Sequence, residues 1–465
     1  MTDPKTRRFF LGAVTAAAAT RVWGANDKIN IAIIGLGGRG TNHLNQYSHL
    51  PESRVAVLCD VNQAAREVAQ ATLAKGGFEK AKEVEDMRQA FADPGVDAVS
   101  IATPNHWHAL AAIWAMKAGK DVYGEKPACY NIYEGMKMVE VQRATGKLMQ
   151  VGSQHRSTPF KMKAIAAMQQ GLIGKIYQTK GLCFKRRVSI GHAENEPTPP
   201  GVNWDLFLGP APMRPFNKLR FKYNWHWFWD TGNGDIGNQG VHEMGIARWG
   251  MGDPEWPMTA YAFGGKYAYQ DDQETPNTLL AGFNYGDREI MFEVRGLLTG
   301  GEGTAVRRMG PGGGRGGRGA APPAAPPDAP APTTVGPTSN PLNVQIGDLF
   351  YGTEGWAAMS DQGFQAYKGE SSELIMEERP ERGQPGGDAT GLHMQNFLQA
   401  CKSRNIKDLH DPLSNAVHSA NLCHLANISY RTGRKLTIEA GPKFAGDAEA
   451  TKMVSREVYR KPYVV

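Results

Sequence analysis

The 465-residue sequence has only five cysteines, and no two of them form a C-x-x-C pair. A disulfide framework favours an even set at short spacings, and a structural zinc site favours closely paired ligands, so the sequence predicts neither. Histidine pairs such as His106/His108 and His418/His424 lack acidic residues at ligand spacing. We therefore expect no metal site. The widely spaced cysteines are Cys59, Cys129, Cys183, Cys401 and Cys423.

Long hydrophobic runs and a strong net charge are also absent. No stretch after the first 25 residues is long and apolar enough to cross a bilayer, which argues against stable membrane insertion. The net charge is only +6, and the excess of basic residues is concentrated in residues 1–25 and 296–340. The rest of the chain is close to neutral, so we expect no nucleic-acid partner.

Residues 1–25 have the pattern of an export signal. Arg7 and Arg8 precede a Phe-Phe-Leu sequence and an alanine-rich stretch of modest hydrophobicity, which is typical of the twin-arginine route. A disordered basic tail is the alternative. The export reading predicts a periplasmic or otherwise exported protein and leaves the cleavage position open. Because this route carries folded proteins, a cofactor could travel inside.

A nucleotide-binding pattern begins directly afterwards. Residues 29–35 form an apolar, β-branched run that predicts a buried strand, and the sequence Gly35-Leu-Gly37-Gly38-Arg39-Gly40 follows it. Glycines at these spacings allow a tight turn, a close approach to a pyrophosphate, and packing of the following helix on the strand. The phosphates would then lie at the positive end of that helix.

An acidic residue ends the next predicted strand, residues 54–60. Asp60 lies twenty residues after Gly40, where a carboxylate can bind the adenosine ribose hydroxyls. A carboxylate repels a 2′-phosphate, so NAD is favoured over NADP. The alternative is that Asp60 only caps the following helix.

Two further strand-and-turn units, at residues 96–103 and 120–127, complete an alternating α/β pattern over residues 28–151. The segments that follow their carboxyl ends should face the cofactor. The resulting cofactor-binding candidates are Gly35, Gly37, Gly38, Arg39, Gly40, Asp60, Thr103, Pro104, Asn105, His108, Glu125 and Lys126.

The glycine turn, Asp60, the sequence TPNHWH at residues 103–108 and above all GEKP at residues 124–127 resemble the Gfo/Idh/MocA oxidoreductases. The resemblance implies an NAD-binding Rossmann domain over residues 28–151. It also implies an α+β domain over residues 152–465 with a large, mainly antiparallel open sheet through which homo-oligomers form. One namesake, glucose–fructose oxidoreductase, is exported by the twin-arginine route with its nucleotide tightly held.

The chain after residue 152 supports an α+β reading without the resemblance. Strands are predicted at residues 175–190, 258–267, 277–286 and 289–296, and helices at 391–403 and 415–431. Between them, residues 300–340 consist largely of Gly, Pro, Ala and Arg, which predicts a disordered loop. An RNA-binding arginine–glycine segment is the weaker alternative.

The reaction should take place between the two domains. Lys126 can stabilise a substrate oxygen, and its pKa could fall in a desolvated cleft. His242 is its expected partner, since a neutral imidazole can accept a hydroxyl proton. The family commonly has two acids around this histidine, whereas this chain has Asn238 and Gly245 there. Asn238 can orient the imidazole without stabilising its cation, and Asp235 could compensate.

Substrate recognition is assigned to the aromatic segment at residues 224–235. Trp225, Trp227 and Trp229 alternate, so in an extended chain they would share one face and present rings suited to a sugar. A core strand is the alternative. The predicted substrate-binding residues are Lys126, His155, Arg156, Trp225, His226, Trp227, Asp235 and His242.

These features favour an NAD(H)-dependent oxidoreductase that acts on a hydroxyl carbon of a carbohydrate, namely a sugar, sugar derivative or glycoside, with a tightly held cofactor. One alternative is a redox-neutral glycosidase that uses bound NAD for oxidation, elimination, hydration and reduction. The other is a non-catalytic sugar-binding protein with a vestigial nucleotide fold. The sequence does not specify the sugar or the carbon that reacts.

Overall fold

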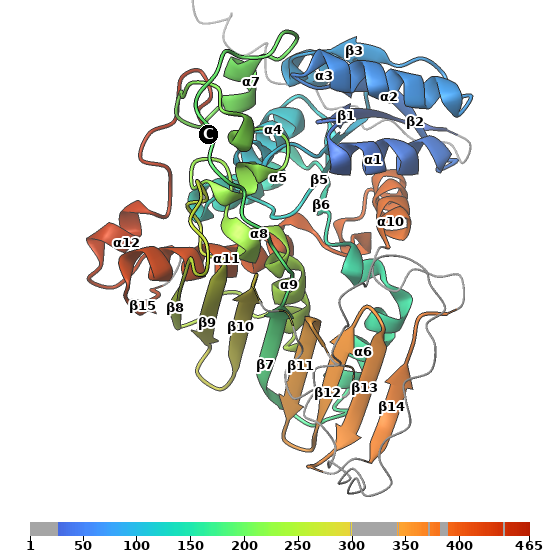
Figure 1. The fold of residues 1–465 in the computed structure, drawn as a ribbon. Coiled ribbons are helices and arrows are strands. Elements are labelled where there is room, and N and C mark those ends of the chain that lie inside the picture. Colours follow the sequence, from blue (N-terminus) through green and yellow to red (C-terminus); the bar gives the residue numbers. More distant parts are fainter. Residues whose placement is uncertain are drawn as a thin grey trace, which may run out of the picture.

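The computed structural model describes residues 27–297, 299, 342, 344–370, 373–381, 389–439 and 442–465. The predicted signal peptide at residues 1–25 and the predicted loop at residues 300–340 lie outside the described residues. Two sheets, one above the other in Figure 1, organise the described chain.

The first sheet contains six parallel strands in the order β3-β2-β1-β4-β5-β6, which is the order of a Rossmann fold. The strands are β1 (Ile29–Ile34), β2 (Ser53–Cys59), β3 (Lys82–Val84), β4 (Ala98–Ile101), β5 (Asp121–Gly124) and β6 (Met149–Val151). The connecting helices are α1 (Gly38–His49), α2 (Gln63–Lys75), α3 (Met87–Phe91), α4 (Asn105–Lys117) and α5 (Ile132–Thr145).

One helix that covers this sheet comes from the far end of the chain. Helix α10 (Thr390–Ser403) places Met394 and Phe397 in the same buried cluster as Ile31 and Tyr47. In Figure 1 this helix, drawn in orange, lies directly below α1. The second half of the sequence thus completes the core of the first sheet, which periodicity alone does not predict.

In the described part of the chain, the second sheet has nine strands in the order β14-β13-β12-β11-β7-β10-β9-β8-β15. Only the β7–β10 pairing is parallel. The strands are β7 (Ile176–Cys183), β8 (Thr259–Gly265), β9 (Thr278–Asn284), β10 (Glu289–Arg295), β11 (Ile346–Gly352), β12 (Gly355–Ser360), β13 (Gly363–Lys368), β14 (Leu374–Glu378) and β15 (Leu436–Thr437). The predicted fold class, a Rossmann domain followed by an α+β domain with a mainly antiparallel sheet, is confirmed.

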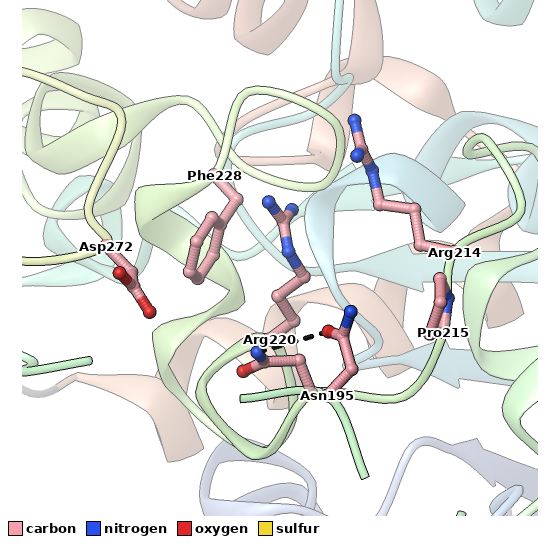
Figure 2. Close-up of a pocket in the computed structure, with 7 residues that line it drawn as sticks. Asn195, Arg214, Pro215, Arg220, Phe228 and Asp272 are labelled. Carbon is pink, nitrogen blue, oxygen red and sulfur yellow. Dashed lines mark hydrogen bonds between the residues drawn. The ribbon is translucent and has the colours of Figure 1, made fainter. Parts of the chain in front are cut away.

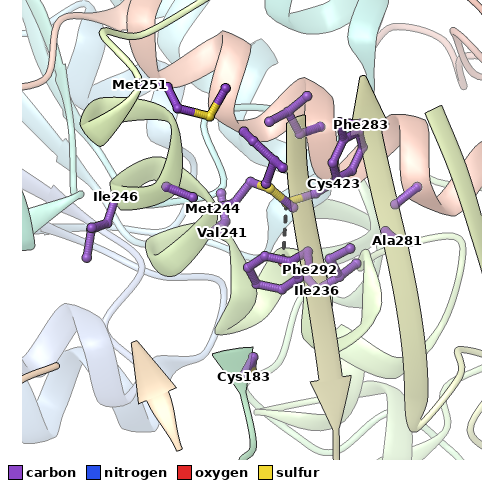
Figure 3. Close-up of a cluster of buried hydrophobic side chains, with 14 of the residues drawn as sticks. Cys183, Ile236, Val241, Met244, Ile246, Met251, Ala281, Phe283, Phe292 and Cys423 are labelled. Atoms are coloured by element: carbon purple, nitrogen blue, oxygen red, sulfur yellow. Dashed lines mark hydrogen bonds between the residues drawn. The ribbon is translucent and has the colours of Figure 1, made fainter. Parts of the chain in front are cut away.

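One face of the second sheet packs on helices. Figure 3 shows Phe283 and Phe292 of the sheet against Met244 of α9 (Gly240–Gly250) and Cys423 of α11 (Leu413–Thr432). The thiol of Cys423 donates to the carbonyl of Ile236 in α8 (Gly234–Asn238) at 3.3 Å. This packing fixes the short α8–α9 corner on the sheet. The remaining helices are α6 (Pro159–Gln169), α7 (Trp204–Leu208) and α12 (Ala448–Lys452).

The sequence predictions differ from the structure at three places. The strand predicted at residues 175–190 ends at Cys183, because charged side chains that follow it turn toward partners off the sheet. Strands β11 to β14 were not predicted. The prediction that the aromatic segment is extended was wrong, because residues Asn224–Trp227 form a 3₁₀ helix. No helix in the described ranges is long and apolar enough to span a membrane.

Candidate functional site

A cleft of about 900 Å³ opens at the carboxyl ends of β1, β2, β4 and β5 and is lined from both halves of the chain. Parallel strands bring their carboxyl ends to one edge of a sheet, so segments far apart in sequence meet there. Of the predicted site residues, the cleft is lined by Gly35, Gly37, Gly38, Arg39, Asp60, Thr103, Pro104, Asn105, His108, Glu125, Lys126, Trp225, His226, Asn238 and His242.

The glycine turn between β1 and α1 has the shape that a diphosphate requires. Gly35 has φ +87°, and a Cβ on it would lie 2.8 Å from the carbonyl oxygen of Ala102. Gly40 packs so closely on the turn that a Cβ would overlap the carbonyl of Gly35. Gly37 and Gly38, by contrast, have nothing within 4 Å of a built Cβ, and α1 begins without a side-chain cap. The space and the free amides fit a bound phosphate group.

Asp60 stands at the end of β2 with its carboxylate already oriented. Its Oδ2 accepts the backbone N–H of Leu36 at 2.7 Å, and its Oδ1 accepts that of Asn62 at 2.8 Å. Each carboxylate oxygen keeps a further lone pair for a ribose hydroxyl. Burial raises the pKa of Asp60, and the two amide hydrogen bonds act against that rise.

Glu125 connects the glycine turn to the end of β5. Burial by itself would raise its pKa, but Arg39 and His43 outweigh burial and hold the pKa well below its usual range. Arg39 Nε donates to Oε1 at 2.7 Å, and His43 Nε2 lies 2.9 Å from the same oxygen. Gly152 gives this carboxylate room, because a Cβ there would lie 2.8 Å from Oε1. Glu125 is therefore a fixed anion beside Lys126.

Lys126 extends from the first domain toward the second. Its Nζ donates to the backbone carbonyl of Asn238 at 2.6 Å. Burial lowers the pKa of Lys126, and the nearby charges of Arg39 and Lys185 act in the same direction, against Glu125. The ammonium has three donors, so the contact with Asn238 leaves others for a substrate oxygen.

His242 projects into the same end of the cleft from α9. Its ring is buried and its Nδ1 has no hydrogen-bond partner among the described residues. Burial holds its pKa well below the ordinary value, and His155 and Lys126 add to this effect, so the imidazole is neutral near pH 7. A neutral imidazole next to an ammonium can accept a proton from a bound hydroxyl.

Asn238 reaches a residue that the sequence analysis missed. Its Nδ2 donates to the hydroxyl oxygen of Tyr223 at 2.9 Å, and Arg187 Nη1 donates to the same oxygen at 3.3 Å. Two donors occupy both lone pairs of that oxygen, so the Tyr223 O–H is left to donate to something else. Tyr223 lines the cleft, half exposed, and its position directly before the predicted aromatic segment was the only sequence signal.

The TPNHWH segment lines the cleft mainly with structural side chains. His108 lies between the carbonyls of Pro127 and Thr103, with ring nitrogens 2.7 and 2.9 Å from them. Asn105 Nδ2 donates to Asn233 in the second half of the chain at 3.2 Å. The hydroxyl of Thr103 is buried without a hydrogen-bond partner among the described residues.

Comparisons with known proteins agree with this geometry. Residues 29–153 match the model of the Gfo/Idh/MocA oxidoreductase family, NAD-binding Rossmann fold, and residues 163–258 match that family's C-terminal alpha/beta domain. Both segments thus match models of one family, the Gfo/Idh/MocA oxidoreductases. The first matched segment contains the glycine turn, Asp60 and Lys126, and the second contains Asn238 and His242.

Individual relatives match about a third of the chain. A levoglucosan dehydrogenase of Pseudarthrobacter phenanthrenivorans is 31% identical over 160 residues, which cover 33% of this chain and 40% of the relative. A glycosyl hydrolase family 109 protein of Bacteroides thetaiotaomicron is 28% identical over 33% of this chain and 34% of the relative. These matches thus span less than half of the relatives' length.

The solved structure of levoglucosan dehydrogenase in complex with NADH and levoglucosan aligns over 89% of this chain and all of that chain, with a TM-score of 0.62 and 17% identity. At this identity the likeness establishes the fold.

Three other predicted substrate residues lie next to the cleft without lining it. His155 packs edge-on to His242, with ring centroids 5.0 Å apart. Asp235 accepts two hydrogen bonds from Arg187, whose guanidinium also covers the ring of Trp227. None of these three predicted residues, His155, Asp235 and Trp227, lines the cleft. His155 instead contacts His242, and Asp235 and Trp227 contact Arg187, which donates to the lining residue Tyr223.

Arg156 faces away from the cleft. Its guanidinium forms an ion pair with Asp253 at 2.6 Å, lies 3.5 Å from Asp411 and covers the ring of Trp249. These contacts occupy its charge in the second domain, so it is not placed to bind a substrate in the cleft. The aromatic segment also differs from expectation, because Trp225 and His226 stack with centroids 3.5 Å apart and both line the cleft.

A second hollow of about 350 Å³ lies near the aromatic segment and is shown in Figure 2. Its two arginines are already paired: Arg214 with Asp230, and Arg220 with Glu274 at 2.8 Å. Arg220 also lies 3.9 Å above the ring of Phe228. With its charges satisfied and no residue of the nucleotide turn nearby, this hollow does not form part of the candidate active site.

Proposed function

We propose that the protein is an NAD-dependent dehydrogenase that oxidises a hydroxyl carbon of a sugar, sugar derivative or glycoside. The observation that carries this proposal is the meeting of Lys126 and His242 at one end of a cleft whose other end is the glycine turn and Asp60. The relative named levoglucosan dehydrogenase supports the substrate class.

The residues present fit the cofactor at both ends. Gly37, Gly38 and the uncapped start of α1 suit the diphosphate, and Asp60 suits the ribose. When bound, the nicotinamide of NAD accepts a hydride from the substrate carbon. Lys126 would hold the hydroxyl oxygen and stabilise the negative charge that develops there. His242 would take the hydroxyl proton, because its buried ring is neutral and its Nδ1 is unoccupied.

The experiment replaces Lys126 by methionine, which keeps the length of the side chain and removes its charge. We expect hydride transfer to fall by about 10²-fold or more while NADH binding, followed by nicotinamide fluorescence, stays nearly intact. Lys117→Met, on the exposed end of α4, is the matched control. An equal loss of NADH binding and turnover in Lys126→Met would show that Lys126 supports the cofactor or the fold instead.

We further propose that the protein is exported with its cofactor and retains it. The support is the Arg7-Arg8 pattern together with a cleft closed by two domains. A retained cofactor must pass its hydride on site to a second substrate that bears a carbonyl group or back to the product of the first step, so purified protein supplied with such substrates should turn over many equivalents after dialysis without added NAD. Activity that falls to zero with free NAD would contradict retention. Hydrolysis of a glycoside without net NADH, with deuterium exchange at C2, would select the redox-neutral alternative.

We also propose a homo-oligomer formed through the outer face of the second sheet. Tyr261 and Phe263 on β8 are about half exposed there, and partly buried Leu280 and Met291 adjoin them on the neighbouring strands. Such a contiguous apolar surface favours association. Sedimentation should give more than one subunit, and Phe263→Glu should shift the protein toward the monomer. A monomer at micromolar concentration would contradict this proposal.

A further inference from the structure

The carboxylates that line the cleft all belong to the first domain. They are Asp60, Glu85 and Glu125. Each already has partners: Asp60 accepts two backbone amides, Glu85 accepts the amide of Asn203 at 3.0 Å, and Glu125 accepts Arg39 and contacts His43. None of them comes from the part of the second domain that closes the other end of the cleft.

The second-domain side of the cleft has positive charge without a matching acid. Its described lining residues include Lys185 and Lys222 but no carboxylate. Lys185, just after β7, donates from Nζ to the side-chain oxygen of Gln239 at 2.8 Å. No ion pair of Lys185 occurs within the described ranges. Its charge is therefore oriented by a neutral amide and left uncompensated.

A second cation lies close to this one. Lys185 is near enough to Lys126 that its charge helps to lower the Lys126 pKa. The neighbouring histidines do not change the balance, because His226 and His242 are held neutral by burial. Two ammonium groups beside each other repel, and an anion placed near both removes that cost.

The neighbouring Arg187 shows how a cation with a purely structural role is neutralised in this protein. Arg187, two residues beyond Lys185, is bound by both oxygens of the buried Asp235. Both arginines in the hollow of Figure 2 also have carboxylate partners. Lys185 differs from all three, and it does so inside the candidate active site.

The diphosphate of a bound dinucleotide does not supply the missing anion. Its expected place is the β1–α1 turn in the first domain, whereas Lys185 is held at the α8–α9 corner of the second domain by Gln239. Because no carboxylate lines the second-domain side of the cleft among the described residues, the substrate is left as the source of the negative charge.

We propose that Lys185 binds a carboxylate on the substrate, so that the preferred substrates are acidic sugars such as uronic acids. This inference rests on the proposed dehydrogenase function. Lys185 would form the ion pair, and the Tyr223 hydroxyl, whose oxygen is already occupied by two donors, would add a hydrogen bond. A carboxylate held there leaves a hydroxyl of the same sugar ring to face Lys126 and His242.

The test compares matched sugars that differ only at C6: glucuronate with glucose, and galacturonate with galactose. We expect the wild-type enzyme to favour the uronate by about 10²-fold or more in kcat/KM, in line with the value of a desolvated charge pair. In Lys185→Met the ratio of uronate to neutral sugar should fall by about 30-fold or more, mainly through KM. Lys175→Met, at the opposite end of β7 and paired with Asp287 on the surface, should leave the ratio unchanged.

The outcomes separate this inference from the proposed function. NADH formation with neutral sugars at least as fast as with uronates would overturn the acidic-substrate inference and leave the dehydrogenase standing. The same ratio in Lys185→Met as in wild type would remove Lys185 from substrate binding. Uronate binding by calorimetry that needs Lys185, without NADH formation from any sugar, would support the carboxylate site and refute the dehydrogenase.

Discussion

Replacing Glu243 by glutamine should remove one large contribution to the pH dependence of the protein's stability. Glu243 follows His242 on α9, is 2% exposed, and has one oxygen, Oε2, without a hydrogen-bond partner among the described residues. Burial raises its pKa from an ordinary value of 4.5 to about 8, and Asp361 acts in the same direction. The nearby Asp348 is buried as well, with both oxygens unpartnered in the described structure.

The sign follows from the raised pKa. Between about pH 4.5 and pH 8 the folded protein holds a proton on Glu243 that the unfolded chain releases, so the free energy of unfolding falls as the pH rises through this window. At about 1.4 kcal/mol per pH unit, the full window corresponds to about 5 kcal/mol. Above about pH 8 the folded protein carries a buried, poorly solvated charge.

Glu243→Gln keeps the shape of the side chain and carries no charge at any pH. Its free energy of unfolding should be close to that of wild type at pH 5 and higher by several kcal/mol, up to about 5, at pH 9. Guanidinium denaturation followed by tryptophan fluorescence at pH values from 5 to 9 measures the difference. Glu83→Gln, on an exposed position of β3, is the control. A difference between variant and wild type that stays constant from pH 5 to pH 9 would refute the reasoning.

Three further results are expected. Asp60→Ala should weaken NAD binding and relax discrimination against NADP, because the carboxylate that repels a 2′-phosphate is lost; an unchanged NAD/NADP affinity ratio would remove Asp60 from the ribose site. Tyr223→Phe should lower kcat/KM by about 10-fold with NADH affinity retained, since the outward hydroxyl donor is lost together with the acceptor for Asn238 and Arg187; equal kinetics would mean that this hydroxyl does not meet substrate. Asn238→Asp should raise the pH at which kcat falls on the acidic side, because a new anion favours imidazolium at His242; an identical pH profile would separate the two residues.

Much of the nucleotide end of the cleft could be predicted from the sequence. The glycine turn, Asp60 and the Glu125–Lys126 pair all follow predicted strands directly. In a parallel sheet the carboxyl ends of the strands lie at one edge, so local patterns are enough to bring these residues together. Gly40 is likewise determined locally, because a Cβ on it would overlap the carbonyl of Gly35, whereas a Cβ on Gly35 would meet Ala102 at the end of β4.

The other end of the cleft depended on contacts that no local pattern encodes. Lys185 meets Gln239, Arg187 meets Asp235, and Tyr223 meets Asn238 across separations of 54, 48 and 15 residues. The aromatic segment shows the same limit. Alternation of tryptophans predicts a shared face only in an extended chain, and the 3₁₀ turn placed Trp225 and His226 on the cleft while Trp227 was buried against Arg187.

The sequence by itself thus determined the fold class, the nucleotide turn and the residues at the strand ends, because these depend on neighbours in the chain and on the regular geometry of a parallel sheet. Only the tertiary structure decided which charges are neutralised. Arg156 and Arg187 form ion pairs with carboxylates outside the cleft, whereas Lys185 donates a hydrogen bond to a side-chain amide that lines it. Charge compensation depends on distances of a few ångströms between segments far apart in sequence, and packing of the second domain sets those distances.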